Sequence, residues 1–478
     1  MSVADRRHPM WSPETMPPRI NLHGAILAHL GSAALICLLF LWPTFEKLGI
    51  QGVAVLSIGL AIVLGCLVAK SLNDGVWSFP FLYFLILCLF HLGLFLSPAI
   101  NDGRMASFLD GIWTGWYSDS LMIRAAYLID LGLLSYATAV GFVSWMSRDL
   151  RPKFKSEIDS SFLAASPMRN SIVDVGGMAL SVAVVTWLYV CVSELGPFFF
   201  LSSYIDYLKA TEGSSVGLIY FGLTIGSALI AQDLTRPTSR AGLIFLLAFL
   251  VLALPMGLRS ESLFPVIAAL AVYIRCHKAP SSMAMVAAIL IGLVAISAVQ
   301  QVRSQGLGGT ALHEVSVSPV KAIEEMGYSA RVLVTTIGWH EASHEPYLSG
   351  ATYVAPLERG VAGILGLPRV EAETDFRLMN VEIAERVGTI GGSIIAEAHH
   401  NLGESGIVLV LGLAGLIASR LCTIPPRPLP LAILGIAASL LLMHVRNSFA
   451  PIFAWGTGGL ALILLAVGIT WLRGRGGH

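Results

Sequence analysis

Runs of apolar residues long enough to cross a bilayer alternate with short polar segments along most of the chain. A membrane-spanning α-helix needs about 20 apolar residues, so each run of roughly 17–25 residues predicts one such helix. The pattern predicts twelve helices, at residues 24–43, 50–69, 76–98, 122–146, 172–194, 216–232, 240–256, 260–275, 281–300, 393–419, 428–445 and 449–471. The expected fold class is therefore an all-α polytopic membrane protein. We find no repeat that relates the first six spans to the last six.

One long polar segment, residues 301–392, interrupts the apolar runs and divides the chain into three expected regions. These are a bundle of about nine membrane helices at 1–300, the polar loop itself, and about three membrane helices at 393–478. Within the loop, "SPVKAIEEMGYSARVLVTTIGW" (318–339) and "TDFRLMNVEIAERVG" (374–388) carry apolar residues at helical spacing. They predict two amphipathic helices that form a lid on the outer leaflet. A solvated linker containing two helices is the alternative.

Composition and charge support a membrane protein and indicate its orientation. Hydrophobic residues make up 55% of the chain and charged residues 13%, about half the charged share of a soluble domain. Lysine and arginine collect on the loops that share a side with the N-terminus, including the run "RDLRPKFK" (148–155). Because cytoplasmic loops carry this excess, we expect both termini in the cytoplasm and residues 301–392 outside. The net formal charge of zero gives no indication of a nucleic-acid partner.

A zinc-binding pattern lies in the polar loop. Residues 340–344, His-Glu-Ala-Ser-His, match H-E-x-x-H, in which two helical histidines and a glutamate serve a metalloprotease. Pro346 follows two residues later, and a proline disfavours helix in the residue before it. The six cysteines lie in apolar spans or short basic loops and form no metal cluster. We expect no metal and no cofactor, with His340 and His344 as hydrogen-bonding residues of a substrate cleft, and a zinc protease as an alternative.

Several ionisable residues lie at the outer ends of apolar spans, where the orientation rule does not place them. Arg259 lies in the short turn "PMGLRSES", and Arg446 separates two apolar spans in "LLMHVRNSFAP". Charges beside hydrocarbon are costly and commonly functional, although a single arginine can also extend to the interface or bind a neighbouring helix. Four more polar residues lie in the predicted helix at 393–419, and their spacing would place them on one face of it. They are Ser393, Glu397, His400 and Glu404.

These residue types suit phosphate chemistry at the membrane surface. Arginine binds phosphate well because its planar guanidinium donates paired, charge-assisted hydrogen bonds. If a lipid-anchored pyrophosphate is a leaving group here, guanidinium groups would stabilise the negative charge that develops on it. A carboxylate or an imidazole could then take the proton from an attacking sugar hydroxyl.

Four short stretches carry a resemblance to a known family. The stretches "EPYLSGATYVAPLERGVAGILGLPR" (345–369), "GGSIIAEAHHNLGESG" (391–406), Gly257–Arg259 and Arg446–Ser448 resemble the O-antigen polymerases of the Wzy type. This chain has His399 and His400 where relatives commonly have aromatic residues. The resemblance implies a membrane-embedded glycosyltransferase of the C-type class in the bacterial inner membrane. Such an enzyme would join undecaprenyl-pyrophosphate-linked oligosaccharide repeat units into a surface polysaccharide such as O-antigen, without a metal.

The resemblance also suggests roles for individual residues. Arg259 and Arg446 would hold pyrophosphate, and Glu397 or His400 would be the base or would orient the acceptor. Further contacts to substrate are expected from Arg303, Arg331, Tyr347, Tyr353 and Asn401. Expected partners are the lipid-linked oligosaccharide, the bilayer, and possible chain-length regulator and flippase proteins, with no nucleic acid. The alternatives are an O-antigen ligase, which uses the same lipid carrier, and a polysaccharide-related transporter or flippase.

Overall fold

A computed structural model describes residues 21–101, 118–147, 166–211, 216–277, 279–302, 318–388, 390–423 and 426–475. The regular elements in these ranges are all helices. Each predicted span contains one: α1 (Leu22–Phe40), α3 (Gly49–Ser71), α4 (Phe79–Leu92), α6 (Asp119–Met146), α9 (Pro167–Leu195), α11 (Val216–Ile230), α12 (Pro237–Ala253), α13 (Arg259–Cys276), α14 (Ser282–Val302), α20 (Ile394–Thr423), α21 (Pro428–Arg446) and α22 (Phe449–Arg475).

The lengths and compositions of these helices confirm a polytopic membrane protein. Among the described residues, eight helical segments are long and apolar enough to cross a bilayer. One of them joins α4 through a 3₁₀ turn, η3 (Gly93–Phe95), to α5 (Leu96–Ile100). Three more, α11, α12 and α14, contain shorter apolar stretches. The remaining predicted span, α13, carries Arg259, Glu261 and Arg275.

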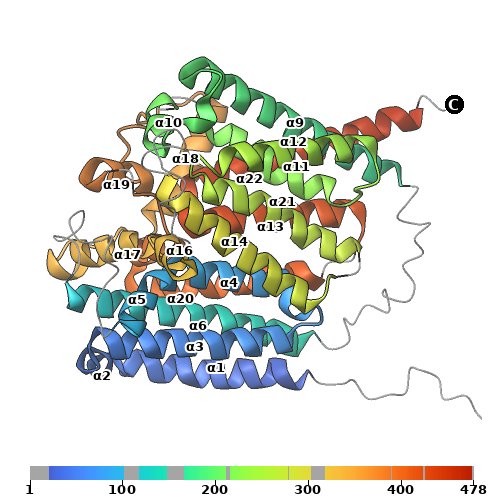
Figure 1. Cartoon of the computed structure of the whole chain (residues 1–478). Coiled ribbons are helices and arrows are strands. Elements are labelled where there is room, and N and C mark those ends of the chain that lie inside the picture. Colours follow the sequence, from blue (N-terminus) through green and yellow to red (C-terminus); the bar gives the residue numbers. More distant parts are fainter. Residues whose placement is uncertain are drawn as a thin grey trace, which may run out of the picture.

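The long helices run side by side, and the short helices gather at one end of the bundle (Figure 1). The short helices are α2 (Trp42–Lys47), α10 (Tyr204–Ala210), α16 (Pro319–Met326), α17 (Ser329–Ile337), α18 (Ala351–Leu365) and α19 (Met379–Val387). Helix α1 begins and α22 ends at the opposite end. The two ends of the described chain therefore share one side. Which compartment each side faces stays a prediction from the charge distribution.

Helix α6 lies at the centre of the larger packing unit, against α1, α3, α4 and α20. Glycines let the backbones approach closely there, since a Cβ at Gly141 would lie 2.7 Å from the Ala28 nitrogen. The second unit is formed by α9, α11 and α12, with Trp187 buried between Phe199 and Phe249. Helices α13 and α21 pack against α11 and connect the two units.

The helices of the polar segment differ from the expected lid. All nine residues of α17 are buried, because this helix inserts between α6, α20 and α4. The expectation that it rests on the outer leaflet is therefore wrong. Its polar side chains are satisfied locally, as the Thr335 hydroxyl donates to the Arg331 carbonyl oxygen at 3.0 Å. Helix α19 is amphipathic as predicted, with Met379 and Ile383 buried. Helix α18 was not predicted, and its apolar Ile364 is 85% exposed.

Candidate active site

The start of α20 is locked to the turn between α21 and α22. The Gly392 N–H donates to the Arg446 carbonyl oxygen at 2.9 Å. A Cβ at Gly392 would lie only 2.6 Å from the Asn447 carbonyl carbon, so only glycine allows this approach. Ser393 caps the helix, since its hydroxyl accepts the Ala396 N–H at 3.2 Å, and it also contacts His91 of α4 at 2.8 Å. The predicted glycine–serine start of the helix thus fixes the backbone of Arg446.

Arg259 and Arg446 come together at the first turn of α13. The Arg446 guanidinium donates from Nη1 to the Ser260 hydroxyl at 2.9 Å, and this hydroxyl donates to Glu261 at 2.9 Å. Arg259 is buried and forms an ion pair with Glu325 of α16 at 2.6 Å. Arg446 is half-buried. We call Arg259, Ser260 and Arg446 the arginine centre, because Arg446 binds the residue that follows Arg259 in the chain.

Glu397 lies on the side of α20 that faces α21 and α22. It is fully buried, and its Oε2 accepts the Phe449 N–H at 2.7 Å and contacts the His444 Nε2 at 3.1 Å. Its other oxygen, Oε1, is buried and has no hydrogen-bond partner among the described residues. Tyr353 of α18 packs on the Phe449 ring, with centroids 5.4 Å apart. Burial, and then the charge of Glu397, raises the pKa of the Tyr353 phenol well above its usual range.

His400 lies about one turn after Glu397 on α20, in a chain of hydrogen bonds. The His340 Nδ1 is 2.8 Å from the Glu345 carbonyl oxygen, which can only accept, so Nδ1 carries the proton. Burial lowers the pKa of His340 and keeps its ring neutral, so its Nε2 accepts from the His400 Nδ1 at 2.8 Å. The His400 Nε2 then lies 2.8 Å from the Glu382 carboxylate. Both ring nitrogens of His400 are therefore engaged, one by His340 and one by Glu382.

A half-buried arginine, Arg124, which the sequence analysis did not select, lies near these histidines. Arg124 of α6 donates from Nε to Glu341 at 2.9 Å and contacts Glu404 from Nη2 at 2.8 Å. Its guanidinium also lies over the rings of Trp42, at 4.7 Å, and Tyr127, at 5.1 Å. The only available signal was a basic residue at the outer end of a long apolar helix. Its two acidic partners come from the polar loop and from α20, which sequence alone does not connect to it.

The H-E-x-x-H residues do not share a helix face. The segment Gly338–Ala342 (η7) is a π-helical turn, and His344 lies beyond it with φ of 57°. His340 points to His400, whereas Glu341 binds Arg124. The Glu341 Oε1 also lies 3.6 Å from the His399 Nε2. The pattern therefore supplies separate contacts rather than the pair of aligned histidines that a zincin needs.

The predicted stripe on α20 is wrong as a single face. Gly403 has φ of 63° and ψ of −144°, so the helix is kinked before Glu404. The kink turns only Glu404 away, toward Arg124 of α6. Ser393, Glu397 and His400 precede the kink and keep their helical spacing, but their partners differ: Ser393 contacts α4, Glu397 contacts α21 and α22, and His400 contacts the polar segment.

The remaining predicted substrate residues occupy different environments. Tyr347 is 42% exposed and lies on the His340 ring, with centroids 4.5 Å apart. Asn401 is fully buried, and its amide nitrogen donates to the Thr352 hydroxyl at 2.7 Å, which ties α20 to the start of α18. Arg331 is buried within α17. Arg303 lies outside the described residues.

Comparison of the sequence with known proteins identifies the family of the chain. The family model described as O-antigen polysaccharide polymerase Wzy matches residues 31–474. The chain belongs to this family. It is also similar to Protein CapE of Staphylococcus aureus, with 21% identity over 415 residues, which cover 84% of this chain and 87% of that protein. No solved structure was found to match. The resemblance inferred from four short stretches is confirmed over almost the whole chain, and polysaccharide polymerisation is the activity at family level.

Proposed function

We propose that the protein polymerises oligosaccharide repeat units carried on undecaprenyl pyrophosphate, at the outer face of the bacterial inner membrane. Both termini would then face the cytoplasm, and the end of the bundle that holds the short helices would face outward. The observation that carries the proposal is the position of Arg446. Its guanidinium binds Ser260 at the first turn of α13. Arg446 also lies two residues after His444, which contacts Glu397. A phosphate-binding cation and a carboxylate thus belong to one connected group.

The arginine centre is the proposed binding site for the donor pyrophosphate. Arg446 supplies a half-buried guanidinium, and the first turn of α13 adds the partial positive charge of a helix N-terminus. The ion pair with Glu325 fixes the position of the Arg259 guanidinium, which lies at the start of the same helix turn. Positive charge at this point stabilises pyrophosphate more as it leaves than while it is bonded to sugar.

Glu397 is the better of the two candidate bases. A base needs an open lone pair that can face the acceptor hydroxyl. Both His400 nitrogens are occupied, by His340 and Glu382, whereas the Glu397 Oε1 has no partner among the described residues. We therefore assign the proton transfer to Glu397 and a positioning role to His400, which holds η7 and α19 against α20.

The transfer step conserves atoms and charge. An oxygen of the acceptor hydroxyl forms a bond to the anomeric carbon of the donor sugar, and the bond from that carbon to the pyrophosphate oxygen breaks. The pyrophosphate leaves with the electron pair and is stabilised by the arginine centre, and the hydroxyl proton passes to the Glu397 Oε1. Because Glu397 is fully buried, the acceptor reaches it only after α18, whose Tyr353 packs on Phe449, moves aside.

Tyr347 and Asn401, which were also predicted to contact sugar, have different roles in this proposal. Exposed Tyr347 offers an aromatic ring to the glycan, and Asn401 holds the start of α18 rather than sugar. A flippase that delivers repeat units and a regulator of chain length are the expected partners. Transfer to a lipid A core, as an O-antigen ligase performs it, is the competing activity.

We expect Glu397→Gln and Arg446→Ala each to slow polymerisation roughly 10²–10⁴-fold, because one removes the base and the other the main charge on the leaving group. Single repeat units should then accumulate. The measurement is polymer formed by the purified protein from purified lipid-linked repeat units. Glu385→Gln, on the exposed face of α19, and Arg420→Ala, at the opposite end of α20, are matched controls and should retain activity.

Normal polymer from both folded site variants would contradict the assignment. Product joined to lipid A core, with no elongation of lipid-linked units, would instead indicate a ligase.

A further inference from the structure

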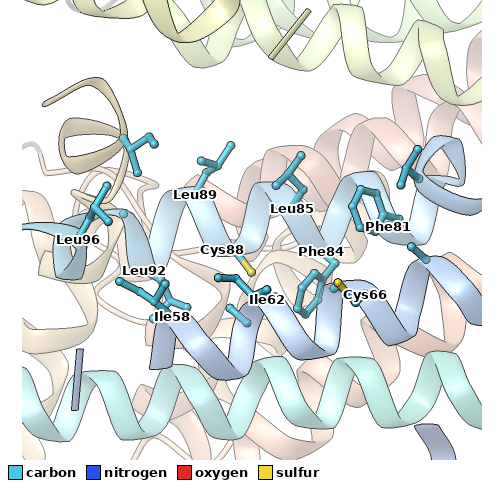
Figure 2. Close-up of a pocket in the computed structure, with 16 residues that line it drawn as sticks. Ile58, Ile62, Cys66, Phe81, Phe84, Leu85, Cys88, Leu89, Leu92 and Leu96 are labelled. Carbon is cyan, nitrogen blue, oxygen red and sulfur yellow. The ribbon is translucent and has the colours of Figure 1, made fainter. Parts of the chain in front are cut away.

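An apolar groove of about 470 Å³ runs between α3 and α4. Figure 2 shows Phe84, Cys88 and Leu92 of α4 facing Ile62 and Cys66 of α3 across it. Apart from the sulfur atoms of Cys66 and Cys88, the side chains that line it are hydrocarbon. The groove therefore suits an apolar ligand that lies within the bilayer.

The groove has the dimensions of one extended chain. From Phe81 to Leu96 the helix axis rises about 22 Å, against about 30 Å for the hydrocarbon core of a bilayer. Small residues at Ala61, Gly65 and Ala69 recur every four positions and leave a narrow recess along one face of α3. A Cβ at Gly65 would already lie 3.4 Å from the Phe84 ring.

One short helix, α16, connects the groove to the arginine centre. Ile323 of α16 lines the end of the groove beside Leu96. Two glycines, Gly93 and Gly327, allow this helix to pack closely. A Cβ at Gly93 would collide with the Ile323 carbonyl oxygen, and a Cβ at Gly327 would collide with the Leu94 nitrogen. Two residues further along, on another face of α16, Glu325 binds Arg259 at 2.6 Å. The end of the apolar groove and a residue of the proposed pyrophosphate site are thus held by the same eight-residue helix.

We propose that this groove binds the isoprenoid chain of the lipid-linked substrate, an inference that rests on the proposed function. A single polyprenyl chain lies along the groove within the membrane, and its pyrophosphate end emerges at α16, on the way to the arginine centre. A phospholipid could place only one of its two acyl chains in the groove, so we expect a carrier with a single chain to bind in preference. The groove would hold the part of the prenyl chain nearest the pyrophosphate and direct that end toward Arg446.

The test uses the full-length protein in phospholipid nanodiscs with a trace of undecaprenyl phosphate that carries a photoreactive diazirine. Crosslinked peptides are mapped by mass spectrometry, and a diazirine-bearing diacyl phospholipid is the comparison probe. We expect the prenyl probe to crosslink mainly to α3 and α4 between Ile58 and Leu96. Ile62→Trp fills the groove from an exposed position, and Val55→Trp, exposed on the same helix but outside the groove, is the matched control.

Groove crosslinks should fall about tenfold or more in Ile62→Trp, since burial of about two methylene groups already accounts for that change in affinity. They should be unchanged in Val55→Trp. Even labelling of all bilayer-facing helices, or equal competition by diacyl phospholipid, would overturn the proposal. If the wild-type protein proves to be a dimer and Ile62→Trp is a monomer, the groove is a helix–helix interface, which also overturns the proposal.

Activity separates this proposal from the one on which it rests. If the prenyl probe crosslinks in the groove but the wild-type protein makes no polymer, the lipid site stands and the polymerase assignment fails. If the protein makes polymer but the prenyl probe does not crosslink in the groove, the proposed lipid site is wrong and the polymerase assignment still stands.

Discussion

At the scale of single residues, hydrogen bonding distinguishes the two candidate bases, Glu397 and His400. Glu397 and His400 are three positions apart on one helix, and residue type gave no reason to prefer either as the base. The hydrogen bonds separate them, because His400 has both nitrogens occupied and Glu397 has one oxygen without a partner among the described residues. Arg124 was missed since its significance depends on Glu341 and Glu404, which reach it from distant segments.

We expect His400 and Glu382 to act as one structural unit. Each of His400→Gln and Glu382→Gln disrupts the same contact between the two side chains, so the double variant should lose less stability than the sum of the single ones. The coupling should be about 0.5–3 kcal/mol in a double-mutant cycle of chemical unfolding in detergent. Both single variants should keep most of their polymerisation rate. A folded His400→Gln protein as inactive as Glu397→Gln would move the base to His400.

At the scale of elements, the periodicity of the sequence predicts where helices form but not where they bend. Helix α20 was predicted as one straight span with a single polar face. The kink at Gly403 turns Glu404 toward Arg124 instead. Similarly, α17 has the composition of a surface helix and is buried all round, because neighbouring helices cover both of its faces.

Gly403→Ala tests the importance of the kink. At φ of 63° and ψ of −144° a side chain is strained, and a Cβ would lie 3.1 Å from the Tyr347 ring. We expect the free energy of unfolding to fall by about 1–3 kcal/mol. Gly468→Ala, in α22 with nothing within 4 Å of the added Cβ, is the control. It should leave stability unchanged or raise it by up to about 1 kcal/mol. Equal effects at both positions would show that the kink is not required.

At the scale of the whole molecule, ion pairs of Arg386 order the polar segment, and contacts of Glu341 and Glu382 with Arg124, His399 and His400 join it to the membrane bundle. Hydrogen bonds from Arg386 hold the pKa of Glu345 below its usual range. Burial alone would raise the pKa of Glu382 and of Glu341, but hydrogen bonds and positive charge outweigh it and lower both values. For Glu382 the partners are His400 and Arg386, and for Glu341 they are His399 and Arg124. The docked segment therefore favours the ionised carboxylates.

We expect acid to release this segment before the core unfolds. A lowered folded-state pKa gives stability that is fully present above the unfolded value, about 4.3 for glutamate, and is lost as the pH falls through the lower folded values. Hydrogen exchange of residues 338–388 should therefore accelerate below about pH 4, while amides of α6 stay protected. Arg386→Gln should show faster exchange in this segment already at neutral pH. Simultaneous loss of protection in α6 would contradict separate release.

The sequence by itself determined the membrane class, the positions of the predicted spans, the family and the presence of arginines at the ends of apolar helices. Those features depend on local composition, since the thickness of a bilayer sets the length of an apolar run and charge is costly beside hydrocarbon. Only the tertiary structure decided that Glu397 and His400 have different partners, that Glu397 keeps an oxygen without a partner among the described residues, and that α16 joins an apolar groove to Arg259. Each of these depends on contacts between residues far apart in the chain, which no local pattern of residues encodes.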